Sequence, residues 1–152
     1  MKGRKPTKAE QIYGQAVIQR CGCIACDKLG HPNDWPEPLE YVEFHHSSEK
    51  GAVKPLAHFF GYGLCPVHHR GATGGNPIPE GEPVRHDPLG SRKQLFFNKV
   101  GTDLELLEYA WSKLPLEALD QIGELTGIWS FEELVREDAK QRNIFENINS
   151  NI

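Results

Sequence analysis

The chain has 152 residues, a net charge of −4 and 38% hydrophobic residues, enough for one domain with a modest core. No apolar run is long enough to span a membrane, and the basic start Met1–Pro6 lacks the apolar stretch of a secretory signal. We therefore expect a soluble, cytoplasmic protein. In that compartment four cysteines bind metal more readily than they form disulfides.

The charge is distributed unevenly along the chain. Residues 1–101 carry 13 Lys and Arg against 10 Asp and Glu, a net charge of +3. Residues 102–152 carry 4 against 11, a net charge of −7. We expect the chain to divide into a core over residues 1–101 and a helical extension over residues 102–152 that packs on it. The uneven charge permits contact with DNA on one face only.

The first element predicted is a helix that starts at the capping box Thr7–Glu10 and runs to Arg20. We expect its apolar side to consist of Ile12, Ala16 and Ile18. Cys23–Cys26 then forms a tight knuckle, and the prolines of residues 30–38 indicate a loop.

Residues 40–46 are rich in strand formers, and residues 56–64 can pair with them as a hairpin across a loop at 47–55. Pro66 suits the first position of a helix, so a short helix should begin at Cys65 or Pro66. The expected local order is strand, strand, helix. Residues 71–94 are rich in Gly and Pro and show no helix or strand pattern, which predicts a long loop.

The last third is predicted to be helical. Thr102–Glu105 is a second capping box, and a further helix over 116–125 should stop near Gly127. Ser130 opens a third helix. The expected apolar face of the first of these helices is Leu104, Leu107, Trp111 and Leu114.

Two Cys-x-x-Cys/His pairs predict a four-ligand metal site. Cys65 and His68 share one face of the predicted helix and can meet a metal held from the other side by Cys23 and Cys26. Two such pairs supply the sulfur and imidazole donors that zinc takes in a closed, structural tetrahedron. Cys21 is left out of this site as a buried thiol.

The other histidines need a separate explanation. His69 is rotated by about 100° from His68 on a helix and must face elsewhere. His45 and His46 end the first predicted strand, and His58 and His86 are further candidates. Cleavage of a phosphodiester needs a base for water and a cation for the phosphate, and imidazoles can serve both needs.

These motifs resemble the HNH, or ββα-metal, endonuclease superfamily, and within it the bacteriophage Ref family of RecA-dependent nucleases. The resemblance covers about residues 20–101. It is carried by Gly22–Cys26, His45–His46, Leu64–Gly71 and, more loosely, Phe97–Gly101. It implies an α+β fold in which a small zinc-stapled ββα-metal core is flanked by an N-terminal helix and C-terminal helices.

The resemblance also implies roles for the histidines. His46 would be the general base, while His45, His69 and His86 would bind a catalytic metal. The superfamily often has an Asn on the second strand to orient the base, and here His58 is the nearest polar residue. His58 would therefore orient His46, or would replace His86 as the third metal ligand.

The function implied is metal-dependent DNA endonuclease activity, of phage or prophage origin and linked to recombination. Arg70 would clamp a phosphate oxygen. Further cations would follow the DNA backbone without reading its sequence. These are Lys5 near the N-terminus, and Arg85, Arg92 and Lys93. Mg²⁺ or Mn²⁺ suits phosphate chemistry, although three imidazoles also bind Zn²⁺. The implied partners are DNA and a RecA-type recombinase filament.

Two alternatives remain from the sequence. One is a zinc-stapled module without catalysis that docks on DNA or on a protein and uses His46 structurally. The other is a metal-dependent hydrolase acting on a different substrate.

Overall fold

The first helix begins where the capping box predicts it. The computed structural model describes residues 5–31, 41–47, 55–88 and 90–150, and in it α1 spans Lys8–Cys21. Glu10 N donates to Thr7 Oγ1 at 3.2 Å, and Thr7 N donates to Glu10 Oε1 at 3.0 Å. Two backbone donors at the start of α1 are thereby satisfied by side chains.

The buried side of α1 differs from the one expected. It consists of Ala9, Glu10, Tyr13, Ala16, Val17 and Cys21. Ile12 and Ile18 are only half-buried. The apolar pattern missed Tyr13, whose ring stacks on Trp111 with centroids 5.0 Å apart and whose hydroxyl donates to Gly61 O at 2.7 Å. Tyr13 thus fixes the rotation of α1 against the sheet.

The predicted hairpin is confirmed, with shorter strands. β1 (Glu43–His46) pairs antiparallel with β2 (Gly61–Leu64), and the register places His45 opposite Tyr62. A Cβ atom on Gly61 would lie 2.3 Å from the Phe44 ring, so glycine is needed for Phe44 to lie across the hairpin. Residues 32–40 and 48–54, where the sequence predicts loops and the start of the first strand, lie outside the described residues.

The expectation that His58 lies on the second strand is wrong. His58 belongs to η1, a single 3-10 turn over Ala57–Phe59 that precedes β2. Leu56 has a φ of 66°, in the left-handed region, and turns the chain before η1. This turn directs the His58 side chain to the end of β1 and away from the strand ladder.

Short helices flank the hairpin. α2 (Ile24–Leu29) starts at Cys23, whose sulfur accepts a hydrogen bond from Cys26 N at 3.4 Å. α4 (Pro66–Arg70) follows β2 directly and has Pro66 at its first position, as predicted. The order strand, strand, helix is therefore present, and the Cys-x-x-Cys and Cys-x-x-His motifs both lie at starts of helices.

The long loop is shorter than predicted. α5 (Ser91–Lys99) begins within residues 71–94 and buries Phe96. The Arg92 guanidinium donates to the carbonyls of Ile78, Pro79 and Glu82 at 2.9 to 3.4 Å. Hydrogen bonds from one side chain therefore hold the loop against α5, although the loop has little regular structure of its own.

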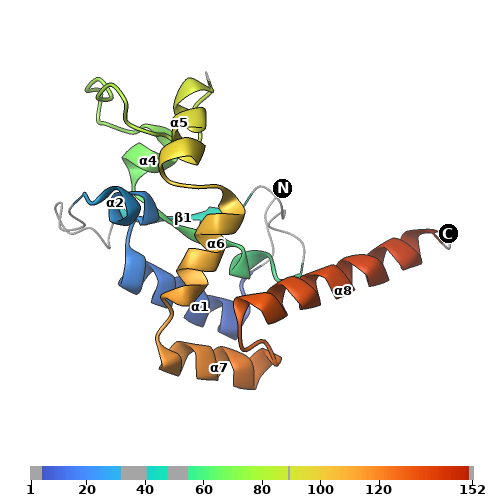
Figure 1. The fold of residues 1–152 in the computed structure, drawn as a ribbon. Coiled ribbons are helices and arrows are strands. Elements are labelled where there is room, and N and C mark those ends of the chain that lie inside the picture. Colours follow the sequence, from blue (N-terminus) through green and yellow to red (C-terminus); the bar gives the residue numbers. More distant parts are fainter. Residues whose placement is uncertain (1–4, 32–40, 48–54, 89, 151–152) are drawn as a thin grey trace.

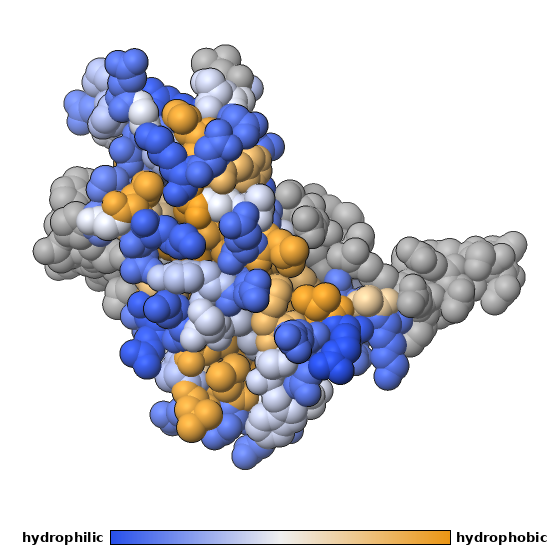
Figure 2. Space-filling model, in the orientation of Figure 1, coloured by the Kyte–Doolittle hydropathy of each residue, from blue (hydrophilic) through white to orange (hydrophobic). Residues whose placement is uncertain are grey.

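The C-terminal helices are α6 (Asp103–Ser112), α7 (Leu116–Thr126) and α8 (Phe131–Ser150). Figure 1 shows α6 crossing in front of the hairpin, α7 near α1, and α8 running outward. Of the predicted apolar face, Leu107, Trp111 and Leu114 are buried, whereas Leu104 is 53% exposed. Helix α6 also buries Leu106 and Ala110. The face shown in Figure 2 accordingly carries apolar groups scattered among polar ones.

The fold is α+β, with one buried apolar cluster that extends from Ala9 to Leu134. This cluster includes α1, the hairpin and the C-terminal helices, so residues on both sides of position 101 contribute to it. Among the described residues, no helix is both long enough and apolar enough to cross a membrane.

Candidate metal centres and active site

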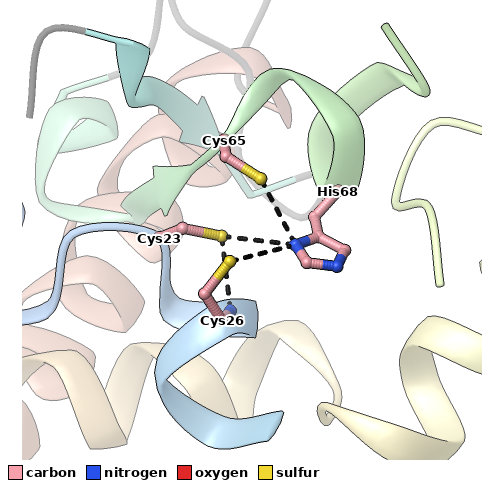
Figure 3. Close-up of side chains that lie close together, drawn as sticks. All are labelled: Cys23, Cys26, Cys65 and His68. Carbon is pink, nitrogen blue, oxygen red and sulfur yellow. Dashed lines mark hydrogen bonds between the residues drawn. The ribbon is translucent and has the colours of Figure 1, made fainter. Parts of the chain in front are cut away.

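The four predicted ligands of the structural site converge. Cys23 at the start of α2 and Cys26 within it face Cys65 and His68 at α4 (Figure 3). His68 Nδ1 lies 3.6, 3.5 and 3.3 Å from the sulfur atoms of Cys23, Cys26 and Cys65. Bond lengths of 2.3 Å to sulfur and about 2.05 Å to nitrogen place such atoms about 3.6 Å apart in a zinc tetrahedron. The donor set and its spacing therefore fit Zn²⁺.

Charge in this cluster also favours a cation. Hydrogen bonds from Cys23 and Cys26 lower the pKa of the Cys65 thiol, whereas contacts with Cys23 and Cys65 raise the pKa of Cys26. Three sulfur atoms packed together cannot all be thiolates without a positive charge among them. A bound metal ion would supply that charge and allow all three thiols to ionise.

Glu82 supports His68 from the long loop. His68 Nε2 hydrogen-bonds Glu82 Oε1, which also lies 3.4 Å from His31 Nε2. A carboxylate on the outer nitrogen of a metal-binding imidazole fixes its tautomer and orientation. The loop therefore contributes a contact to the candidate four-ligand group, and this contact was not predicted from the sequence.

Cys21 lies outside this group. Its thiol is 3% exposed and has no place among the clustered ligand atoms. Burial raises the pKa of Cys21 to about 11, so it stays a neutral thiol. This is the environment of a core residue and not that of a metal ligand.

His45, His69 and His86 form a second group. One ring nitrogen from each lies within 4.8 Å of the others, and the ring centroids are 4.9 to 5.3 Å apart. Backbone hydrogen bonds hold His86 beside His69, because His86 N donates to His69 O at 2.9 Å and Arg85 N donates to His68 O at 2.7 Å. The structure places His86, and not His58, in this group.

The second group is suited to a cation. His45 is 2% exposed, and its Nε2 has no hydrogen-bond partner among the described residues. Burial lowers the pKa of His45 to about 3, so the ring is neutral and can offer a lone pair. Burial and the neighbouring His69 also lower the pKa of His86. A buried polar atom without a partner is costly, and a metal ion would satisfy it.

Glu43 orients His69. Its Oε1 lies 3.0 Å from His69 Nδ1 and accepts from Arg70 Nε at 3.1 Å. The bond to Arg70 holds the pKa of Glu43 below its usual range, so the carboxylate is charged. His69 therefore donates from Nδ1 and leaves Nε2 as the nitrogen available to a ligand. The sequence analysis did not identify Glu43, which shares a strand face with His45.

His46 pairs with His58 on the other side of β1. His46 Nε2 and His58 Nδ1 lie 2.8 Å apart. The rings of Phe44 and His46 meet edge-on, with their centroids 5.2 Å apart. Glu10, 2% exposed, accepts from His58 N at 2.8 Å and holds the turn in place. Burial, followed by the effect of His58, lowers the pKa of His46. The two imidazoles thus form a hydrogen-bonded pair at the end of β1.

Arg85 has a different role from the one expected. It is 2% exposed, its NH2 nitrogen donates to Asp103 Oδ2 at 3.1 Å, and its guanidinium lies 4.9 Å from the centre of the Phe97 ring. A guanidinium buried in this way cannot follow a DNA backbone, so the expectation for Arg85 is corrected. The Arg92 guanidinium donates hydrogen bonds to backbone carbonyls of the loop. Lys5 and Lys93 are exposed, and Arg70 is 56% exposed.

Breaking the Arg85–Asp103 pair should destabilise the protein strongly. Arg85→Met leaves the Asp103 carboxylate, 6% exposed, without its cation. We expect the free energy of unfolding to fall by about 3–5 kcal/mol in urea denaturation of the metal-loaded protein. The matched control Lys93→Met removes an exposed cation and should change it by less than about 0.5 kcal/mol. Equal effects of the two substitutions would contradict a structural role for Arg85.

Residues 6–115 match the family described as "Recombination enhancement, RecA-dependent nuclease". The matched stretch contains every cysteine and histidine of the chain. No curated protein and no solved structure matches the chain significantly.

Proposed function

The chain belongs to the RecA-dependent nuclease family, and from that premise we propose that it is a metal-dependent DNA endonuclease of the HNH, or ββα-metal, type. The observation that carries this proposal is that Cys23, Cys26, Cys65 and His68 form one ligand group and that His45, His69 and His86 form another. A further group in the described residues, His31, His68 and Glu82, shares His68 with the first. The first group uses four protein ligands and is closed. The second uses three imidazoles and leaves coordination positions for water and phosphate.

Cys23, Cys26, Cys65 and His68 would hold a structural zinc ion, and His45, His69 and His86 would hold the catalytic ion. The catalytic ion, Mg²⁺ or Mn²⁺ with Zn²⁺ as a competitor for three imidazoles, would supply positive charge to the phosphate and to the leaving 3′ oxygen. The support for the second site is the buried, unpartnered Nε2 of His45 and the Glu43 carboxylate that fixes His69.

His46 is proposed as the general base. If its Nε2 donates to His58 Nδ1, its own Nδ1 carries a lone pair that can accept a proton from water. The same hydrogen bond makes His58 the residue that selects the tautomer and orientation of His46. The lowered pKa of His46 keeps the ring in the neutral form that a base requires.

Arg70 is proposed to bind a phosphate oxygen next to the scissile bond. Its guanidinium is exposed and hydrogen-bonds the Glu43 carboxylate from the same helix end that carries His69. A phosphate would compete with Glu43 for Arg70 and find a bidentate donor there. The exposed Lys5 and Lys93 are proposed to add backbone contacts that do not depend on sequence.

The pH dependence of cleavage should report His46. Because burial and His58 lower the pKa of His46, the rate should fall on acidification with a half-point below 6.5. His58→Ala removes one of these effects and exposes the ring, so the half-point should move upward toward 6.5. The measurement is the cleavage rate from pH 4.5 to 8, with bound zinc quantified at each pH because acid releases thiolate ligands. An unchanged half-point would count against this pairing.

The proposal is tested by incubating metal-loaded protein with plasmid and single-stranded DNA, with Mg²⁺ or Mn²⁺, and with or without a recombinase filament. We expect cleavage that requires the divalent ion and is abolished by a chelator. A requirement for the filament would extend the proposal to dependence on a RecA-type partner. DNA binding without cleavage under every condition would instead favour a zinc-stapled docking module.

A further inference from the structure

A hollow of about 490 Å³ lies between α1 and β1, beside the His46–His58 pair. Its lining residues are Pro6, Glu10, Gln11, Gly14, Gln15, Ile18, Gln19, Phe44 and His58. None of these residues belongs to either metal-ligand group. The volume is within the range of small-molecule sites.

The helix side of the hollow is lined by amides. Gln11, Gln15 and Gln19 are four residues apart along α1 and therefore share one helix face. All three side chains are exposed, and an amide carries two N–H donors and one acceptor oxygen. Gln11 Nε2 donates to Pro6 O at 3.2 Å, which leaves Gln11 one N–H donor and its oxygen. Such groups match the hydrogen-bonding edge of a nucleobase, as glutamine does when it contacts adenine.

The strand side of the hollow offers an aromatic ring. Phe44 lines it, and Gly14 on α1 faces that ring, because a Cβ atom on Gly14 would lie 3.7 Å from Phe44. The ring atoms within 4 Å of that Cβ position are Cε2 and Cδ2, so Gly14 lies beside one edge of the Phe44 ring and adds no side chain there. Phe44 is only partly buried where it borders the hollow, and such a ring is suited to stacking with a base.

The hollow joins the proposed catalytic groups. His58 lies in its wall and contacts His46 at 2.8 Å, and Phe44 shares a strand face with His46. Its one carboxylate among the described lining residues, Glu10, is 2% exposed and bonded to Thr7 N and His58 N. The exposed Lys5 adjoins Pro6 at the rim, so the hollow suits part of an anionic strand.

We infer that this hollow, here called the glutamine pocket, binds one unstacked nucleobase of the DNA strand next to the scissile phosphate. A base can enter a recess between a helix and a strand only when it is not paired and stacked in a duplex. The bound base is therefore out of the stack, either in single-stranded DNA or flipped from a duplex. This inference rests on the proposed nuclease function and names a contact between the site and its substrate strand.

The test couples protein variants to abasic substitutions in the DNA. Binding of fluorescent single-stranded oligonucleotides, each with one abasic site at a different position, is measured in a His46→Ala background that does not cut. In that background we expect one position at which loss of the base weakens binding about tenfold or more. Gly14→Leu extends a branched side chain from the edge of the Phe44 ring into the hollow and should abolish the binding loss caused by that abasic site. Gln15→Ala should reduce this loss.

Two controls separate pocket filling from damage to the fold. Gly14→Ala adds only a methyl group at ordinary contact distance from Phe44 and should keep the abasic effect. Gln121→Ala removes an exposed amide on α7, outside the glutamine pocket, and should also keep it. Zinc content and circular dichroism confirm the fold of each variant, and Gln15→Ala tests the pocket independently if Gly14→Leu misfolds.

The inference is overturned if no abasic position weakens binding, or if Gly14→Leu and Gln15→Ala both leave the effect unchanged. A parallel cleavage assay on the His46-containing protein distinguishes the two proposals. If wild type cleaves DNA but no abasic position weakens binding, the glutamine pocket is rejected and the nuclease proposal stands. Absence of cleavage by wild type with every metal and filament rejects the nuclease proposal and, with it, the assignment of the pocket to a substrate strand.

Discussion

Replacing Cys23 with serine should abolish binding of the structural metal and unfold the protein. The site joins α2 to α4 through four ligands, and the surrounding hairpin has strands of only four residues each. Structural zinc sites contribute about 10–16 kcal/mol in small peptides, which equals or exceeds the whole stability of a typical domain of about 5–15 kcal/mol. We therefore expect loss of the cooperative thermal transition by circular dichroism, together with loss of bound zinc.

Cys21→Ala provides the matched control, because Cys21 is buried two residues away and outside the ligand group. This variant should keep its zinc and melt cooperatively, at a slightly lower temperature because a small cavity forms. A folded, zinc-free Cys23→Ser protein would show that the ion is dispensable for the fold.

Replacing His46 with alanine should remove cleavage and leave the fold intact. A positioned general base typically contributes a factor of about 10² to 10⁴ to the rate. His46 is half-buried at the end of β1, and its contacts are the rings of Phe44 and His58, so its loss leaves both metal-ligand groups in place. The measurement is the single-turnover cleavage rate of DNA with Mg²⁺ or Mn²⁺, with metal content determined on the same sample.

His31→Ala controls for the loss of an imidazole as such. His31 is exposed and lies against Glu82, outside the His46–His58 pair and the second ligand group. The His31→Ala variant should cut DNA at a rate close to that of wild type. If His46→Ala cut as fast as His31→Ala, the base would have to be another group.

The sequence predicted well those features that depend on neighbouring residues. Capping boxes placed the starts of α1 and α6, and Pro66 placed the start of α4. The Cys-x-x-Cys and Cys-x-x-His spacings brought four ligand atoms together, because residues three positions apart on a helix share a face. In each of these cases the chemistry is local.

Features that depend on distant contacts were missed. The acidic partners Glu43, Glu82 and Asp103 contact residues 14 to 56 positions away, and no short motif marks them. Arg85 resembled a DNA contact because its charge is visible in the sequence whereas its burial against Asp103 is not. His58 was assigned to a strand because the 3-10 turn follows from a left-handed Leu56, which the sequence does not signal.

The proposed second, catalytic ion is tested most directly by the metal content of wild type and of His69→Ala. Metal content is measured by elemental analysis after equilibration with Zn²⁺ and gel filtration. We expect two ions per chain in wild type and one in His69→Ala. The variant should keep its cooperative melting transition and lose DNA cleavage. One ion per chain in both proteins, or two in His69→Ala with cleavage unimpaired, would contradict the existence of a second, catalytic ion at His45, His69 and His86.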